Sequence, residues 1–413
     1  MARLGGLLAF DPVRPCGTGG AFYLNVPALV DGARAIGDGW TVEVLRGNPF
    51  VVARRETPVA SYENSRDMAF AAAQRGLDLL CIARVADLSI RNAVEWHVTW
   101  REDGGTAVLR VTVTKTITAK SEAIVVAYDQ SGNPLPTPHI PAGEWQQSLR
   151  FFRLAQVTDD LFDAYRNLYL ALESILDRLA PQKTKPAATG GMKPDEREGE
   201  WFKRALGEAD KQVGIAAFAP QGTADPVAYL FDEFYVRIRT ALFHAKSSRH
   251  MFLPHAETGQ EAVQAGIERL GRLYLALAGR LLGLSGPASV ITYEGFEYMA
   301  KQWEPQFGVH VGCDPTPSDD ADFRPGGDKS LQLTAGPEPG LDAPHLKVFV
   351  GRAECAAITA LDRVTAVAAT LGGKTVATWD IAGGLDLAGV GRLEVQVGIR
   401  LRNVHMPKIM FGA

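Results

Sequence analysis

Four residues separate Arg239 from His244, near the C-terminal end of the most amphipathic helix that this chain can form. An arginine and a histidine held together on a helix can act on one phosphate. The guanidinium stabilises negative charge on the phosphate oxygens, and the imidazole accepts or donates a proton. We therefore expect chemistry at a phosphodiester, and cleavage of RNA in particular.

The spacing alone is weak evidence, because short arginine–histidine patterns recur by chance. Three other pairs have a similar spacing: Arg91 and His97, Arg249 and His255, and Arg400 and His405. The first and last pairs lie in stretches where polar and apolar residues alternate, as in β-strands. Only the segment around His244 has convincing helical periodicity, so its position selects this pair.

The expected helix has one continuous apolar face, formed by Val227, Leu230, Phe231, Phe234, Ile238, Ala241, Leu242 and Ala245. At about 100° per residue, Glu233, Arg237, Thr240 and His244 share one flank, whereas Arg239 and Lys246 share the other. A straight helix therefore favours Arg237 as the nearer partner of His244. Arg239 has a long side chain that a helix end or a second subunit could bring to the same phosphate, so both arginines stay candidates.

Basic residues dominate the end of this helix. No Asp or Glu occurs from Val236 to His255, whereas Arg237, Arg239, Lys246, Arg249 and three histidines do. The candidate ligands of RNA phosphates are Arg237, Thr240, Lys246 and Arg249. The alternative is a solvated basic end that complements the helix dipole. Because the whole chain has a formal charge of −4, contact with RNA must be focused here rather than spread over the surface.

The 413 residues predict an α+β multidomain protein with three domains. Residues 1–150 alternate like antiparallel strands, with a hairpin at Asp103-Gly104-Gly105 and one helix that begins near Asn64 or Ser65. His97 lies on the polar face of one of these strands, where we expect it to be solvated and without a role. Residues 286–413 return to alternation, with a hairpin at Gly372-Gly373, and predict a β-sandwich-like domain.

Residues 151–285 have helical spacing and predict a four-helix, up-and-down bundle. The expected helices run from about Val157 to Leu179, from Trp201 to Ala209, from an N-cap at Asp225 to Lys246, and from Thr258 to Leu284. An exposed loop, Pro181 to Glu200, joins the first two helices. The third helix carries the Arg239–His244 pair.

The composition favours a cytoplasmic protein without a cofactor. The four cysteines are scattered, with no CxxC pair, so neither a zinc ribbon nor a disulfide framework is expected. No metal-binding HExxH motif or glycine-rich phosphate loop occurs. We expect neither a signal peptide nor a membrane span, because the apolar stretch near Leu270 to Leu284 is interrupted by Arg272 and Arg280.

The central segment resembles the HEPN superfamily, especially its Apea-like and MauJ-like branches. Two stretches carry the resemblance: Tyr169-Leu170-Ala171-Leu172-Glu173 on the first helix, and Arg237-Ile238-Arg239-Thr240-Ala241-Leu242-Phe243-His244-Ala245-Lys246 on the third. The resemblance covers about a third of the chain and neither β-rich part. It implies an Arg-x4-His site that is completed across a homodimer formed through the bundle.

The resemblance also implies cleavage of RNA without a metal. The ribose 2′-hydroxyl would attack the adjacent phosphate and leave a 2′,3′-cyclic phosphate. His244 would be the general base or acid, and Arg239 would stabilise the phosphate oxygens. Glu173 would orient His244 or Arg239. The alternative interpretation is that Glu173 is only a carboxylate at the edge of the bundle.

One residue departs from the family pattern. Relatives commonly carry Asn, Asp or His after the motif arginine, whereas this chain carries Thr240. Two hypotheses follow. The chain is a HEPN ribonuclease, a toxin or antiviral effector whose β-rich domains sense a trigger or partner protein or position RNA. Alternatively, it is a catalytically inactive HEPN module for binding or assembly.

Overall fold

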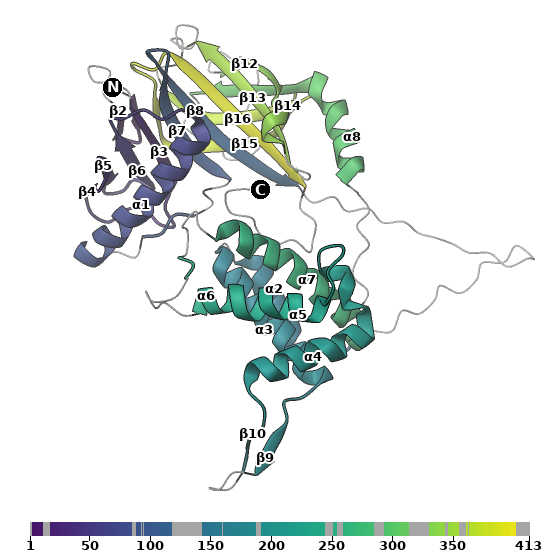
Figure 1. Ribbon diagram of the computed structural model, residues 1–413. Helices are drawn as coiled ribbons and strands as arrows, with labels where there is room; N and C mark the ends of the chain where they lie inside the picture. The colour runs from purple at the N-terminus through teal and green to yellow at the C-terminus, as the bar shows by residue number, and fades with distance from the viewer. Residues whose placement is uncertain are drawn as a thin grey trace, which may run out of the picture. The chain divides into compact units, whose positions relative to one another are not determined.

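A computed structural model describes residues 2–10, 17–84, 88–91, 93, 95–117, 143–158, 160–186, 191–243, 251–253, 259–284, 293–313, 330–342, 346–354, 361 and 363–401. The chain divides into two units. We call the first, Met1–Thr118 with Ile291–Arg402, the sheet unit, and the second, which contains Ala119–Val290, the helical unit (Figure 1).

The sheet unit takes strands from both ends of the chain. The first part supplies β1 (Ala2–Leu4), β2 (Leu7–Phe10), β3 (Thr18–Tyr23), β4 (Gly32–Ile36), β5 (Trp40–Val44), β6 (Phe50–Arg55), β7 (Trp96–Asp103) and β8 (Thr106–Ile117). The second part supplies β11 (Phe307–Gly312), β12 (Ser330–Pro337), β13 (Leu346–Glu354), β14 (Val364–Leu371), β15 (Lys374–Asp386) and β16 (Arg392–Leu401). Within the described residues these form one sheet in the order β2-β1-β15-β14-β11-β12-β13-β16-β8-β7-β3-β6-β5-β4.

The sequence predicted two separate β-rich domains. The structure instead places both β-rich segments in one unit. They are joined where β16 pairs with β8 in parallel, with Leu393 opposite Leu109 and Val395 opposite Val111. Polar and apolar alternation shows which side of a strand is buried, but it does not show which other strand lies beside it. The expected C-terminal sandwich is therefore one half of a shared sheet.

One hydrophobic core fills the concave side of this sheet. It includes Leu109 and Leu393 from the central strands together with Leu4 and Phe50 from strands near the two ends. The end strand β2 also contacts β6, the third strand from the other end, because Arg54 Nη1 donates to Leu8 O at 3.1 Å. The sheet thus curves until its two end regions approach each other around the core, as its natural twist allows.

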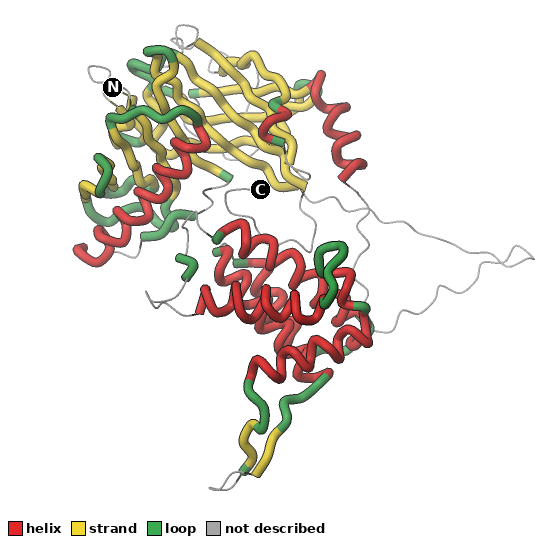
Figure 2. Tube along the Cα trace, viewed as in Figure 1, coloured by secondary structure: helices red, strands yellow, loops and turns green. Residues whose placement is uncertain are grey.

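Helix α1 (Tyr62–Arg84) covers part of the opposite side of the sheet, and α8 (Tyr293–Trp303) precedes β11 (Figure 2). Helix α1 begins two residues before the expected start, where Ser61 Oγ accepts a hydrogen bond from the Asn64 amide at 3.1 Å. Its Ser65 hydroxyl donates to Trp100 O at 3.0 Å, which fixes the helix to β7.

Beside α1, His97 is buried rather than solvated. Its Nδ1 lies 2.8 Å from Ala93 O, and burial lowers its pKa to about 3, so the ring is neutral. The expectation of a solvated histidine failed because the polar side of this strand lies against the sheet-covering helix. Both predicted hairpins are confirmed: Gly104 and Gly105 join β7 to β8, and Gly372 and Gly373 join β14 to β15, all four with positive φ.

The helical unit contains α2 (Ser148–Val157), α3 (Leu161–Leu179), α4 (Glu198–Val213), α5 (Pro226–Phe231), the π-helix η2 (Asp232–Arg239), α6 (Thr240–Phe243) and α7 (Gln260–Leu282). The expected first helix begins only at Leu161, because Asp160 accepts the Asp163 amide at 2.7 Å and acts as its N-cap. The expected loop from Pro181 to Glu200 contains a hairpin of β9 (Thr184–Pro186) and β10 (Met192–Pro194), which projects from the unit (Figure 1).

The apolar stripe of α3 forms the centre of this unit. Leu168, Leu172 and Ile175 are fully buried and belong to one core with Phe234 of η2 and Leu273 of α7. Periodicity located this stripe in the sequence correctly. Within the described ranges, no helix is both long and apolar enough to cross a membrane.

Because the two units have separate cores, we expect a cavity in one core to loosen that unit first. Leu172→Ala should cost about 2–5 kcal/mol and raise amide hydrogen exchange in α3 and α7. Leu393→Ala is the matched change in the sheet unit and should act on β8 and β16 instead. Exchange measured by mass spectrometry that rises equally in both units for either variant would contradict this division.

Candidate functional site

The helix that carries Arg239 is not a straight α-helix. Its N-terminus agrees with the prediction, since Asp225 Oδ1 accepts the Ala228 amide at 2.9 Å. The next segment, η2 (Asp232–Arg239), is π-helical, and the Thr240 hydroxyl donates five residues back to Tyr235 O at 3.0 Å. A π-helix turns through a smaller angle per residue than an α-helix, so the flanks computed for a straight helix no longer apply. Such segments are rare in proteins overall, but those that occur are often found at functional sites.

The changed winding separates residues that the straight helix placed on one flank. Glu233 is buried and forms an ion pair with Arg269 of α7. Arg237 is exposed to solvent. Arg239 points instead toward α3 and α4, where it meets the residues described below. The structure therefore gives Arg239, not Arg237, the more enclosed surroundings.

Arg239 forms an ion pair with Glu198, the first residue of α4. Its Nη2 donates to Glu198 Oε1 at 2.6 Å, and only 20% of the arginine side chain is exposed. The sequence did not single out Glu198, because it lies in the expected loop and its partner is 41 residues away. Its place in the first turn of α4 is electrostatically favourable, since carboxylates stabilise the positive end of a helix.

Three aromatic rings surround the same guanidinium. Its carbon lies 4.8 Å from the Tyr235 ring centre, 5.5 Å from that of Phe243 and 5.7 Å from that of Tyr169. Aromatic faces attract a cation, and more strongly where water is excluded. The rings and Glu198 thus hold Arg239 in one place. A side chain that binds a phosphate with fixed geometry requires such positioning.

Glu173 of α3 lies in the electrostatic field of this group. Burial, and next the charge of Glu198, raise the pKa of the Glu173 carboxyl, whereas Arg239 lowers it. Burial also raises the pKa of Tyr169 well above its ordinary value. The structure therefore brings Glu173 and Arg239 near each other, and Glu173 binds its proton more tightly than an ordinary glutamate does.

Three of the predicted site residues, His244, Lys246 and Arg249, lie outside the described residues. The described part of the helix ends at Phe243, one residue before His244. Farther along the chain, the Phe252 amide donates to Ala241 O at 3.0 Å, so the chain returns to the same helix. The site can therefore be built from Arg239, Glu173 and Thr240, together with the missed Glu198.

Arg239 keeps donors for a further ligand. A guanidinium has five N–H groups, and the bond to Glu198 uses one of them. Its Nε is buried and has no hydrogen-bond partner among the residues that the structure describes. A phosphate oxygen could bind the remaining N–H groups of the terminal nitrogens while Glu198 still orients the side chain. Within the described ranges, no group of three or more His, Cys, Asp or Glu side chains is placed to hold a metal ion.

Comparisons of this chain with protein-family models, with curated proteins and with solved structures find no match. Function must therefore be argued from the residues and their geometry.

The electrostatic coupling around Arg239 leads to a testable change in titration. Glu198→Gln removes a negative charge that raises the pKa of Glu173, so this pKa should fall. Arg239→Gln removes a positive charge that lowers the same pKa, so it should rise. Carbon NMR of side-chain-labelled glutamate across a pH series measures both shifts. The geometry would be refuted if Glu173 titrated identically in the two variants and the wild type.

Proposed function

We propose that the helical unit is a metal-independent endoribonuclease of the HEPN type, in which Arg239 and His244 act on one RNA phosphate. The observation that carries this proposal is the setting of Arg239, which a carboxylate and three aromatic rings hold at the end of a π-helix. Five positions later the sequence supplies His244, and Lys246 and Arg249 follow as phosphate ligands.

In the proposed reaction, the ribose 2′-oxygen attacks the adjacent phosphorus and the bond from phosphorus to the 5′-oxygen breaks. A base takes the proton of the 2′-hydroxyl, and an acid gives a proton to the departing 5′-oxygen. His244 supplies one of these roles. Arg239 stabilises the charge on the non-bridging oxygens, and Glu198 positions Arg239 through its ion pair. Glu173 of α3 orients Arg239 or His244.

A second candidate is an inactive HEPN module for binding or assembly. Two contacts favour it. Arg239 already has a carboxylate partner in Glu198, and the Thr240 hydroxyl donates its proton to the backbone at Tyr235 O. In either case, we propose that the protein is a toxin or antiviral effector. Its sheet unit would bind a trigger or partner protein, or position the RNA.

The ribonuclease proposal predicts the order of three single variants. His244→Ala should lower the rate of RNA cleavage by about 10²- to 10⁴-fold, because it removes a proton-transfer group. Arg239→Ala should lower it by about 10²- to 10³-fold. Arg237→Ala, an exposed arginine of the same helix, is the matched control and should have a smaller effect. Gel assays on total RNA in the presence of a chelator measure all three.

Two results would move the assignment to the inactive module. One is intact RNA after incubation with the wild-type protein under all trigger conditions tested. The other is cleavage that survives in both the His244→Ala and the Arg239→Ala variants. A reversed order of the two arginine variants would instead assign the phosphate contact to Arg237.

We further propose that the protein is a homodimer through the helical unit, because one Arg–His pair is sparse for a complete phosphodiesterase site. Sedimentation velocity at micromolar concentration should show a species of twice the chain mass. Mixing His244→Ala and Arg239→Ala proteins should then restore part of the activity if each active site uses residues from both chains. A monomer at every concentration, without complementation, would count against the dimer.

A further inference from the structure

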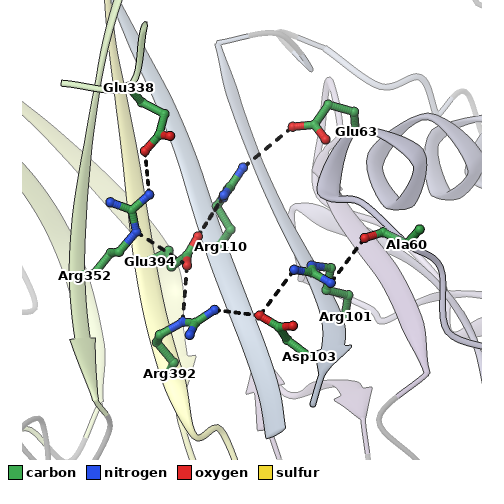
Figure 3. A network of polar contacts seen from close by, with 9 residues as sticks. All are labelled: Ala60, Glu63, Arg101, Asp103, Arg110, Glu338, Arg352, Arg392 and Glu394. Carbon is green, nitrogen blue, oxygen red and sulfur yellow. Dashed lines mark hydrogen bonds and ion pairs between the residues drawn. The ribbon is translucent and has the colours of Figure 1, made fainter. Parts of the chain in front are cut away.

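A second group of charged side chains lies in the sheet unit, on the side of the sheet that faces α1. Three arginines from neighbouring strands converge there on Glu394 of β16 (Figure 3). Arg110 of β8 donates two N–H groups to Glu394 Oε2, at 2.8 and 3.1 Å. Arg392 and Arg352 approach the other carboxylate oxygen, at 3.3 and 3.7 Å.

This group has an excess of positive charge at its centre. Glu394 is almost fully buried, with 4% of its side chain exposed, and it faces three guanidinium groups. A fourth, that of Arg101, lies nearby on β7 (Figure 3). The balancing carboxylates are all at the rim and substantially exposed: Glu63 at 47%, Asp103 at 42% and Glu338 at 36%. An anion from solvent could therefore replace a rim carboxylate without disturbing Glu394.

Asp103 marks where such an anion would bind. Its Oδ2 lies 3.3 Å from Arg101 Nη2 and 2.9 Å from Arg392 Nη2, so one oxygen bridges two arginines (Figure 3). Asp103 is the last residue of β7, directly before the exposed Gly104-Gly105 turn. Because Asp103 lies at the end of its strand beside the turn, its carboxylate can move away at lower cost than Arg101, inside β7, or Arg392, which is paired with strands on both sides.

The beginning of α1 adds two features that favour an anion. Arg101 Nη1 donates to Ala60 O at 3.3 Å, so the N-terminus of α1 lies at the group, and a helix N-terminus attracts negative charge (Figure 3). The Tyr62 ring lies under the guanidinium groups of Arg110 and Arg101, at 3.6 and 4.8 Å.

The Tyr62 hydroxyl is an unused donor at this place. The residue is 93% buried, as its 7% exposure shows, and among the described residues its hydroxyl has no hydrogen-bond partner. Burial and the nearby Glu394 raise the pKa of Tyr62 to about 12, so the hydroxyl keeps its proton at neutral pH. A purely structural ion-pair network has no need of this hydroxyl, whereas an oxyanion ligand would accept a hydrogen bond from it.

We propose that Arg101, Arg392 and Tyr62 form a binding site for a phosphoryl group, which takes the place of the Asp103 carboxylate. A phosphate has several oxygens, so it can accept from both guanidinium groups and from the tyrosine at once, which one carboxylate oxygen cannot do. Glu394 does not bind the ligand but holds Arg392 and its neighbours in place. Release of Asp103 would also free the β7–β8 turn, so binding of the phosphoryl group would change the conformation of this turn.

The test is calorimetric titration of the full chain with inorganic phosphate and, separately, with adenosine monophosphate, at constant ionic strength. Asp103→Asn removes the competing charge and should tighten binding by about tenfold, or roughly 1.4 kcal/mol. Arg101→Gln should abolish binding. Glu43→Gln is the matched control, because Glu43 pairs with Arg54 at 2.6 Å in the same unit, and it should bind like the wild type.

Saturation by both probes assigns the site to phosphate itself, and saturation by the nucleotide alone assigns it to a nucleotide phosphoryl group. The proposal is overturned if neither probe binds to the wild type or to Asp103→Asn at millimolar concentration. It is also overturned if Asp103→Asn and Glu43→Gln bind with equal affinity. Asp103→Asn alone decides the matter if circular dichroism shows that Arg101→Gln does not fold.

Discussion

The parallel pairing of β8 with β16 is the constraint on which the rest of the structure depends. It joins Val108–Ile117 to Arg392–Leu401, two segments separated by most of the chain. The chain between them must leave the sheet and return to it, and the helical unit occupies this long connection. The same pairing brings Arg110 beside Glu394, so the buried charges of the sheet unit exist only when both halves of the sheet have come together. Closing so long a connection is entropically expensive, and the shared core offsets it.

The site around Arg239 and the charged group around Glu394 both keep arginine side chains partly withdrawn from water. A guanidinium that is withdrawn from water needs a carboxylate partner, and Arg239 has Glu198 while Arg101 has Asp103. Arg239 also lies against three aromatic rings and Arg101 against the Tyr62 ring, which add attraction without neutralising the charge. Such arginines have a fixed geometry before any ligand arrives. A phosphate can then bind with little loss of side-chain entropy, and this is the physical basis of both proposals.

Local patterns in the sequence located much of the fold but little of the candidate site. The apolar stripe through Leu168 and Leu172, the Asp225 N-cap and the two glycine hairpins were predictable, because each depends on residues a few positions apart. The β8–β16 pairing was not, since alternation is compatible with any neighbouring strand. Glu198 was missed for the same reason: its contact with Arg239 depends on how two helices pack. The π-helix η2 left no signal in a wheel drawn at α-helical pitch, so the flanks assigned to Arg237 and Arg239 did not hold.

We propose that the helical unit cleaves RNA by attack of the ribose 2′-hydroxyl, with Arg239 at the phosphate. The chemistry of the product ends tests this proposal most directly, because the product ends depend on which atom attacks and not on the rate. Mass spectrometry of fragments from a short synthetic RNA should show a 2′,3′-cyclic phosphate on one product and a 5′-hydroxyl on the other. Fragments that end in a 3′-hydroxyl and a 5′-phosphate would show that water attacked instead, and would contradict the account.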